Sequence, residues 1–201
     1  NDCWPAVSWS SIDGLGNWKA LHYKVKQAFE NRIIVPFEQN NFLKIKVVDD
    51  GPETLKAPMQ VLFYDFSGNL LHQTPTRSVR TFNEKNQVVY QVDLREINFD
   101  PKQTYAKVLF GAIQEIHYFK KPKDLRLPME GFEIKTNTVS QGIEISLKAT
   151  TLQKNVFLYT NTPGHFTDNF FDLLPGQEKK IIFETKEPQS TMLQYKTLNA
   201  L

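Results

Sequence analysis

The sequence predicts a mainly β protein whose strands form two tandem β-sandwiches. After Glu30, apolar and polar residues alternate, as in Leu43, Ile45 and Val47 with the lysines between them, which is the pattern of a strand with one wet face. Turn signals recur between these short runs, as they do in sandwich folds. A basic stretch with two prolines, residues 120–128, lacks this alternation and predicts the boundary between the two sandwiches.

The stretch before the β region predicts one helix, over residues 18–30. Asn17 is the expected N-cap, because its side-chain oxygen can accept a hydrogen bond from a backbone N–H of the first turn. The apolar residues that share one face at helical spacing are Trp18, Leu21, Val25, Ala28 and Phe29. We expect this apolar stripe to be buried against another part of the protein.

The first β block contains seven expected strands. They lie near residues 33–38, 43–47, 60–66, 69–73, 87–93, 105–112 and 115–120. The stretch from Asp65 to Asn69 predicts a turn between two of them, because Gly68 and Asn69 tolerate positive φ. A second turn is expected at residues 49–52, and Asp100-Pro101 interrupts the chain before the strand that contains Tyr105.

The second β block follows the same rules without repeating the first block's sequence. Alternating or short apolar runs predict strands around residues 132–134, 143–147, 156–158 and 181–183. Leu174-Pro175-Gly176 predicts the turn that leads into the last of these strands.

Composition argues against several classes of function. The chain has 24 basic and 22 acidic residues, a formal charge of +2, which gives no support for nucleic-acid binding. No apolar run approaches the roughly 20 residues that cross a bilayer, so no membrane partner is expected. The one cysteine, Cys3, excludes an internal disulfide framework. The four histidines have no metal-ligand spacing, so neither a metal nor another cofactor is expected.

Three motifs resemble the C-terminal part of β-mannosidases of glycoside hydrolase family two. Residues 1–23 contain NDCWP, SWSSID and GNWKALHY, which are similar to the end of that family's catalytic barrel. Residues 118–128, YFKKPKDLRLP, are similar to the junction between its last two domains. Residues 166–176, FTDNFFDLLPG, are similar to its terminal mannosidase immunoglobulin-like domain.

The resemblance implies three segments. Residues 1–30 would be a remnant of a TIM barrel, its last strand and helix, and in the parent protein the apolar stripe of the helix would cover the last strand, around Asp2 to Val7. Residues 31–124 would be a first immunoglobulin-like β-sandwich, and residues 125–201 a C-terminal mannosidase immunoglobulin-like β-sandwich. The fold class is therefore two tandem immunoglobulin-like sandwiches preceded by a barrel remnant. The expected partners are the upstream catalytic barrel of the same polypeptide and, in the parent enzyme, a mannoside substrate.

The implied function is that of the C-terminal accessory region of a β-mannosidase, a retaining exo-glycosidase that releases terminal non-reducing β-D-mannose. A retaining glycosidase needs two carboxylates about 5–5.5 Å apart, and the family supplies both as glutamates on earlier barrel strands. No glutamate here stands in a matching motif, so we expect no catalytic residue in this chain. The fragment alone is predicted to be inactive, with a scaffolding role.

Trp4 is the one substrate-binding residue that we predict. Active sites of such barrels lie at the C-terminal ends of the strands, and an indole at that mouth can stack on the apolar face of a pyranose. The resemblance implies the same role, as floor of the subsite that holds the terminal mannose. The alternative is that Trp4 packs under the helix. Packing is the expected role of Trp9 and Trp18.

Other polar residues receive structural interpretations. Asp2 is expected to cap backbone N–H groups, and Cys3 to be an inert buried thiol. Asp168, Asn169 and Asp172 resemble a calcium loop in their oxygen ligands, but the twelve-position pattern and its closing glutamate are absent. An Asx-turn is therefore the preferred interpretation.

Two other classes of function stay open. One is a free-standing carbohydrate-binding module that uses exposed aromatic residues such as Tyr90, Tyr118 or Phe170. The other is a purely structural or interaction pair of sandwiches, since this fold hosts many functions. The motif in residues 1–23 favours the glycosidase interpretation, because neither alternative needs the end of a barrel. The chain opens without methionine, so we expect further sequence upstream, and a bacterial periplasm or cytoplasm are both open as the compartment.

Overall fold

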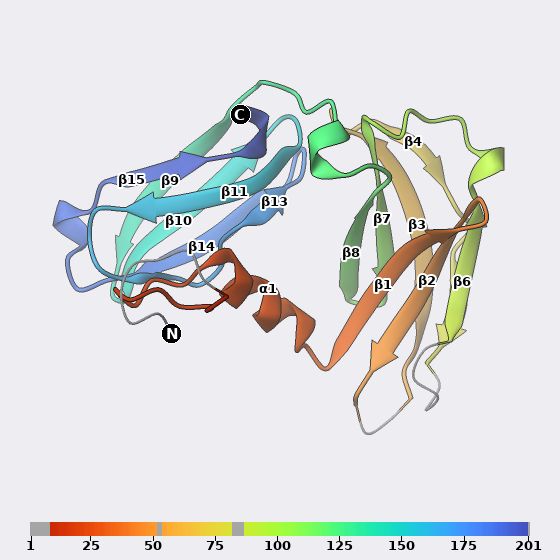
Figure 1. Cartoon of the computed structure of the whole chain (residues 1–201), viewed down its shortest axis with the longest axis horizontal. Helices are drawn as coiled ribbons and strands as arrows, with labels where there is room; N and C mark the ends of the chain where they lie inside the picture. Colours follow the sequence, from red (N-terminus) through yellow and green to blue (C-terminus); the bar gives the residue numbers. More distant parts are fainter. Residues whose placement is uncertain (1–8, 52–53, 82–86, 201) are drawn as a thin grey trace. The chain divides into compact units, whose positions relative to one another are not determined.

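The computed structural model describes residues 9–51, 54–81 and 87–200, and its ribbon is shown in Figure 1. The chain divides into two compact units, Glu30–Arg126 and Asn1–Phe29 together with Leu127–Leu201. Strands dominate both units, so the prediction of a mainly β protein is confirmed. Among the described residues, no helix has the length and apolarity needed to cross a membrane.

Two antiparallel sheets form the unit Glu30–Arg126. The first has the order β1-β2-β6 and the second β4-β3-β7-β8, with β5 pairing with β3 beside β4. The strands are β1 (Arg32–Gln39), β2 (Phe42–Asp49), β3 (Lys56–Asp65), β4 (Leu70–Gln73), β5 (Arg77–Arg80), β6 (Val88–Asp93), β7 (Thr104–Phe110) and β8 (Ile113–Tyr118). Two short 3₁₀ helices, η1 (Leu94–Glu96) and η2 (Pro122–Asp124), complete the unit.

Alternation along the strands builds the core of this unit. Leu43, Ile45 and Val47 are buried on β2, as their spacing predicts, while the lysines between them are partly exposed. They join buried residues of β3 and β7, such as Phe63 and Phe110, in one hydrophobic cluster. Because this cluster draws on both sheets, the unit is a sandwich.

A buried carboxylate fixes the turn that follows β2. The side chain of Asp49 is 4% exposed and accepts hydrogen bonds from Arg32 Nε at 2.7 Å, Thr81 Oγ1 at 2.9 Å and the backbone N–H of Gly51 at 3.0 Å. Burial alone would raise the pKa of Asp49, but the hydrogen bonds from Arg32, Gly51 and Thr81 outweigh it and hold this pKa below its ordinary value. Asp49 therefore ties three separate segments together in its ionised form.

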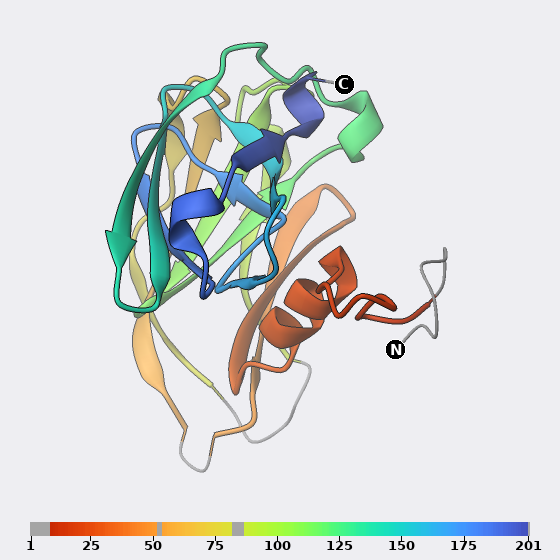
Figure 2. The same ribbon diagram turned by 90° about the vertical axis from the view of Figure 1, so that its left-hand side faces the viewer.

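The C-terminal unit contains two further antiparallel sheets, with the orders β12-β14-β10-β9 and β13-β11-β15. The strands are β9 (Phe132–Val139), β10 (Gly142–Ala149), β11 (Gln153–Thr160), β12 (His165–Phe166), β13 (Phe171–Leu173), β14 (Glu178–Glu184) and β15 (Leu193–Lys196). The 3₁₀ helices η3 (Pro188–Ser190) and η4 (Leu198–Ala200) lie at the two ends of β15 (Figures 1 and 2). One buried cluster again includes residues of both sheets, among them Ile145 and Leu158.

The N-terminal helix differs from its prediction in its start and in its buried face. It is α1 (Ala20–Ala28), with Lys19 as N-cap and no capping side chain. Asn17 does not cap it, since it lies two residues before the N-cap, and its side-chain Nδ2 donates to Asp13 Oδ2 at 2.9 Å. The buried residue of α1 is Tyr23, which is 3% exposed. The face of α1 that is buried is thus the one that contacts the C-terminal sandwich, and apolar spacing did not identify it.

The expected apolar stripe of α1 is exposed in this structure. Leu21 is 47% exposed, Val25 40% and Phe29 83%. The strand expected to be covered by this stripe, around Asp2 to Val7, lies outside the described residues, so its burial in the parent protein stays a prediction. Trp9, which we expected to pack, is 98% exposed, because no described residue covers its indole. That residues 1–30 are the end of a barrel stays a prediction.

Candidate functional site

A cleft with aromatic walls lies within the C-terminal unit. Its cavity has a volume of about 460 Å³ and is bounded by the segment around Trp18 and Tyr23, by β11, and by the chain from Thr160 to Phe170. We call it the aromatic cleft. Its volume falls in the range of roughly 300–1,000 Å³ that is usual for small-molecule sites.

Alternation on β11 supplies one wall of the aromatic cleft. Val156 and Leu158 are fully buried, so Phe157 and Tyr159 project from the opposite face of the sheet. The ring of Phe157 stacks with two others. Its centroid lies 4.6 Å from that of Phe170 and 5.3 Å from that of Tyr159. Phe157, Tyr159 and Phe170 therefore form a continuous set of partly exposed rings, which we call the aromatic row.

Asn169 holds the loop that carries Phe170. It is buried, and its Oδ1 accepts from the backbone N–H of Leu158 at 2.8 Å while its Nδ2 donates to the Leu158 carbonyl at 2.8 Å. The same Oδ1 accepts from the N–H of Phe170 at 3.0 Å, and Phe170 has a φ of 55°. The loop is thus pinned to β11 by one amide, which is a different device from the expected Asx-turn.

The carboxylates beside this loop form ion pairs rather than a calcium site. Lys179 Nζ lies 2.7 Å from Asp168 Oδ2, and Lys154 Nζ lies 2.9 Å from Asp172 Oδ2. In each pair the lysine neutralises the negative charge of the carboxylate, which a bound cation would need. Over the described part of the chain, no group of three or more histidine, cysteine, aspartate or glutamate side chains could hold a metal ion.

The facing wall of the aromatic cleft is built by the N-terminal segment. The indole of Trp18 stacks with the imidazoles of His22 and His165, each with centroids 4.4 Å apart. The hydroxyl of Tyr23 donates to the carbonyl of Phe166 at 3.3 Å. Burial raises the pKa of Tyr23 to about 12, so this phenol stays neutral at physiological pH.

Polar groups line the edge of the aromatic cleft. Asp13 Oδ2 accepts from Asn17 Nδ2 at 2.9 Å, and hydrogen bonds from the side chain and backbone of Asn17 lower the pKa of Asp13. Asp13 is the one carboxylate among the described residues that line the cleft. The described lining therefore combines aromatic faces with polar groups and does not contain the carboxylate pair that a retaining glycosidase needs.

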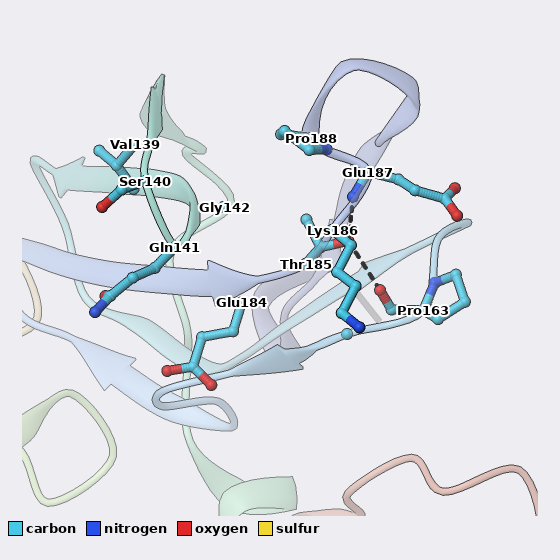
Figure 3. A pocket seen from close by; sticks show the side chains of 11 residues that line it. Val139, Ser140, Gln141, Gly142, Pro163, Glu184, Thr185, Lys186, Glu187 and Pro188 are labelled. Carbon is cyan, nitrogen blue, oxygen red and sulfur yellow. Dashed lines mark hydrogen bonds between the residues drawn. The ribbon is translucent and has the colours of Figure 1, made fainter.

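A second hollow lies at the end of the β10–β14 pair (Figure 3). It has a volume of about 790 Å³, and none of the described residues that line it is aromatic. Thr185 organises it, since its hydroxyl donates to the Pro163 carbonyl at 3.0 Å and accepts from the N–H of Glu187 at 3.2 Å. This hollow offers polar and charged groups without a surface for stacking.

The predicted site residues have different outcomes. Trp4, Asp2 and Cys3 lie outside the described residues, so the substrate-binding role of Trp4 stays a prediction. Tyr90 belongs to the unit Glu30–Arg126, is partly exposed and donates to the Pro75 carbonyl at 3.2 Å.

Of the aromatic residues considered for a binding module, Phe170 lies in the aromatic cleft, while Tyr118 packs on Phe66 and Tyr105. Phe157 and Tyr159 were missed, although the alternation around Val156 and Leu158 already places them on the outer face of the sheet.

Comparison with known proteins first defines the class of the C-terminal unit. Residues 127–199 match the Ig_mannosidase family, described as an Ig-fold domain. This match agrees with the two-sheet sandwich, and the prediction of a terminal mannosidase immunoglobulin-like domain is confirmed.

The whole chain resembles β-mannosidases. It is 28% identical over 213 residues to beta-mannosidase A of Aspergillus flavus, covering 92% of this chain and 23% of the relative. It is also 28% identical over 216 residues to beta-mannosidase A of Aspergillus terreus, covering 94% and 23%. The chain thus spans about a quarter of the length of the curated relatives it matches, and the predicted resemblance to a part of a β-mannosidase is confirmed.

A solved structure shares the fold. The crystal structure of beta-D-mannosidase from Dictyoglomus thermophilum matches 98% of this chain and 25% of its own chain, with a TM-score of 0.78 and 21% identity. At this identity the match establishes the fold of the chain and nothing further about its chemistry.

Proposed function

We propose that this chain is the C-terminal accessory region of a β-mannosidase, a retaining exo-glycosidase that releases terminal non-reducing β-D-mannose. The observation that carries the proposal is the alignment with beta-mannosidase A over 92% of this chain but 23% of the relative. The Ig_mannosidase match of residues 127–199 supports the same assignment. In this proposal residues 31–124 and 125–201 are the two accessory sandwiches, and residues 1–30 are the end of the barrel.

The chemistry of the described carboxylates supports a non-catalytic role for the chain itself. Retaining hydrolysis needs one carboxyl group as acid and base and a second as nucleophile, about 5–5.5 Å apart. Asp49, Asp168 and Asp172 are instead held in ion pairs with basic side chains. Among the described residues, the aromatic cleft offers one carboxylate, Asp13, whose lowered pKa keeps it ionised and unsuited to donate a proton.

The exposed face of α1 supports the upstream barrel as partner. Leu21, Val25 and Phe29 leave much of their apolar surface in water, and a contiguous exposed apolar patch usually marks an interaction site. A catalytic barrel in the same polypeptide would cover this stripe. The role of the two sandwiches would then be to support that barrel.

An activity assay with an aryl β-mannoside tests the proposal. The 201-residue chain should show no turnover, whereas the longer natural polypeptide that contains it should hydrolyse the substrate with retention of anomeric configuration. Turnover that co-purifies with the 201-residue chain after host enzymes are removed would contradict the non-catalytic assignment. A longer polypeptide with no activity on any β-mannoside would contradict the assignment to a β-mannosidase.

A further inference from the structure

We propose that the aromatic cleft binds a β-linked mannose oligosaccharide through the aromatic row. That the cleft takes a neutral saccharide follows from its own chemistry, and the identity of the sugar as mannose rests on the proposed function. The site would give the accessory region a binding function of its own, in addition to scaffolding.

The aromatic row departs from what a sandwich surface normally carries. Outward-facing positions of a sandwich strand are usually polar, yet β11 presents Phe157 and Tyr159 there, and Phe170 extends the row. All three are partly exposed, although the N-terminal segment lies across from them. The cavity of about 460 Å³ between the two walls shows that packing among the described residues leaves this surface open.

Aromatic faces and polar edges together match the chemistry of a sugar. The face of a pyranose presents C–H groups, which an aromatic ring with its negative face attracts. The hydroxyl groups of the sugar need donors and acceptors at the rim, and the Tyr159 hydroxyl, the Asn17 amide and the Asp13 carboxylate line the cleft. Asp13 and Lys19 bring one charge of each sign, so the lining suits a neutral ligand.

The hollow in Figure 3 is the weaker candidate, although it is larger. Its described lining consists of Glu184, Lys186 and Glu187 together with small and polar residues, and this lining contains no aromatic ring on which a sugar could stack. The Pro163 carbonyl and the Glu187 backbone N–H are already engaged in hydrogen bonds with the Thr185 hydroxyl. The presence of stacking rings therefore favours the aromatic cleft over this hollow as a sugar-binding site.

Calorimetry and saturation-transfer NMR on the 201-residue chain with β-1,4-mannotriose test the proposal, with cellotriose as the comparison sugar. Tyr159→Ala removes one ring of the row, and we expect it to weaken mannotriose binding about 5- to 150-fold, the range that loss of one aromatic stacking partner costs for a nucleic-acid base. Phe29→Ala is the matched control, because Phe29 is an exposed aromatic residue that does not line the cleft. It should leave binding unchanged.

Tyr159→Phe keeps the ring and removes the hydroxyl, and it guards against a Tyr159→Ala variant that fails to fold. We expect it to weaken binding only a few-fold, as loss of one hydrogen bond does. Melting temperatures of all variants establish that each is folded before binding is compared.

The outcomes separate the cleft from the proposed function. Mannotriose binding that Tyr159→Ala reduces and Phe29→Ala does not reduce supports the proposal. Equal binding of cellotriose with the same dependence on Tyr159 would overturn the assignment to mannose. Absence of binding by either sugar, or binding indifferent to Tyr159→Ala, would overturn the cleft as a site, even if the longer polypeptide hydrolyses mannosides. If the 201-residue chain binds mannotriose but the longer polypeptide has no β-mannosidase activity, the binding site is supported and the proposed function is overturned.

Discussion

Tyr23 holds the N-terminal segment on the C-terminal sandwich, and replacing it by alanine should release that segment. Tyr23 is the buried residue of α1, and its hydroxyl donates to the Phe166 carbonyl at 3.3 Å. Burial of such a side chain is worth about 1.5–3 kcal/mol, and the hydrogen bond adds about 1 kcal/mol. Tyr23→Ala should therefore weaken docking by about 3 kcal/mol. Since a nine-residue helix is marginal by itself in water, the released segment should also lose its helix.

Hydrogen exchange of the α1 amides measures this release directly. A loss of about 3 kcal/mol corresponds to roughly 100-fold faster exchange, because each 1.4 kcal/mol is a factor of about ten. Leu21→Ala is the matched control on the same helix, because Leu21 is 47% exposed. It should change the free energy by less than about 0.5 kcal/mol. Unchanged protection of α1 in Tyr23→Ala would refute the reasoning, since docking would then depend on other contacts.

The raised pKa of Tyr23 adds a pH dependence of known sign. Docking favours the neutral phenol, so the pKa of Tyr23 rises from its ordinary value of about 10 to about 12. Its contribution to docking is complete below pH 10 and is lost as the pH rises from about 10 through 12. A tyrosinate absorbance titration should show one phenol titrating near 12 that is missing in Tyr23→Phe. If Tyr23→Phe instead removed a phenol that titrates near pH 10, Tyr23 would have its ordinary pKa and the burial argument would be contradicted.

Three further substitutions test other parts of the structure. Asp49→Asn should lower the free energy of unfolding by about 1–3 kcal/mol at pH 7. Because the pKa of Asp49 is lowered in the folded chain, this difference in stability from the unmodified chain should shrink below about pH 4. Chemical denaturation at pH values across that range checks both points. Asn169→Ala leaves the buried backbone N–H and carbonyl of Leu158 unpaired, which costs about 1–3 kcal/mol for each group, and an unchanged melting temperature would contradict this. In the longer polypeptide, Trp4→Ala should lower kcat/KM and leave the fold intact, with a loss of about 1–3 kcal/mol of transition-state stabilisation. Unchanged steady-state kinetics would assign Trp4 to packing.

Elements whose signals are local could be predicted from the sequence. The turn after β3 is an example, because Asp65 Oδ1 accepts from the N–H groups of Ser67 and Asn69, each at 2.9 Å, and Gly68 has a φ of 88°. All of these features depend on residues within the turn itself. The burial of Leu43 and its neighbours on β2 likewise follows from alternation alone.

Features that depend on distant surfaces could not be predicted. Apolar spacing placed Leu21 and Phe29 on the face of α1 expected to be buried, whereas the sandwich contacts Tyr23. Nothing in the sequence of α1 shows which face meets a surface more than a hundred positions away. The short strands β5, β12, β13 and β15 were missed for a related reason, since their two to four residues are too few to establish a period.

Docking of the N-terminal segment and binding in the aromatic cleft should be coupled. Trp18 and Tyr23 form one wall and Phe157 and Tyr159 the other, so the cleft is complete only while α1 is docked. A ligand that binds only the docked form stabilises it by RT ln(1 + [L]/Kd), about 2.7 kcal/mol when the ligand is at 100 times its Kd. Saturating mannotriose should therefore slow exchange of the α1 amides about 100-fold, and Tyr23→Ala should weaken mannotriose binding although Tyr159 is unchanged. Binding without any effect on α1 protection would mean that the aromatic row acts alone, without the wall that the N-terminal segment provides.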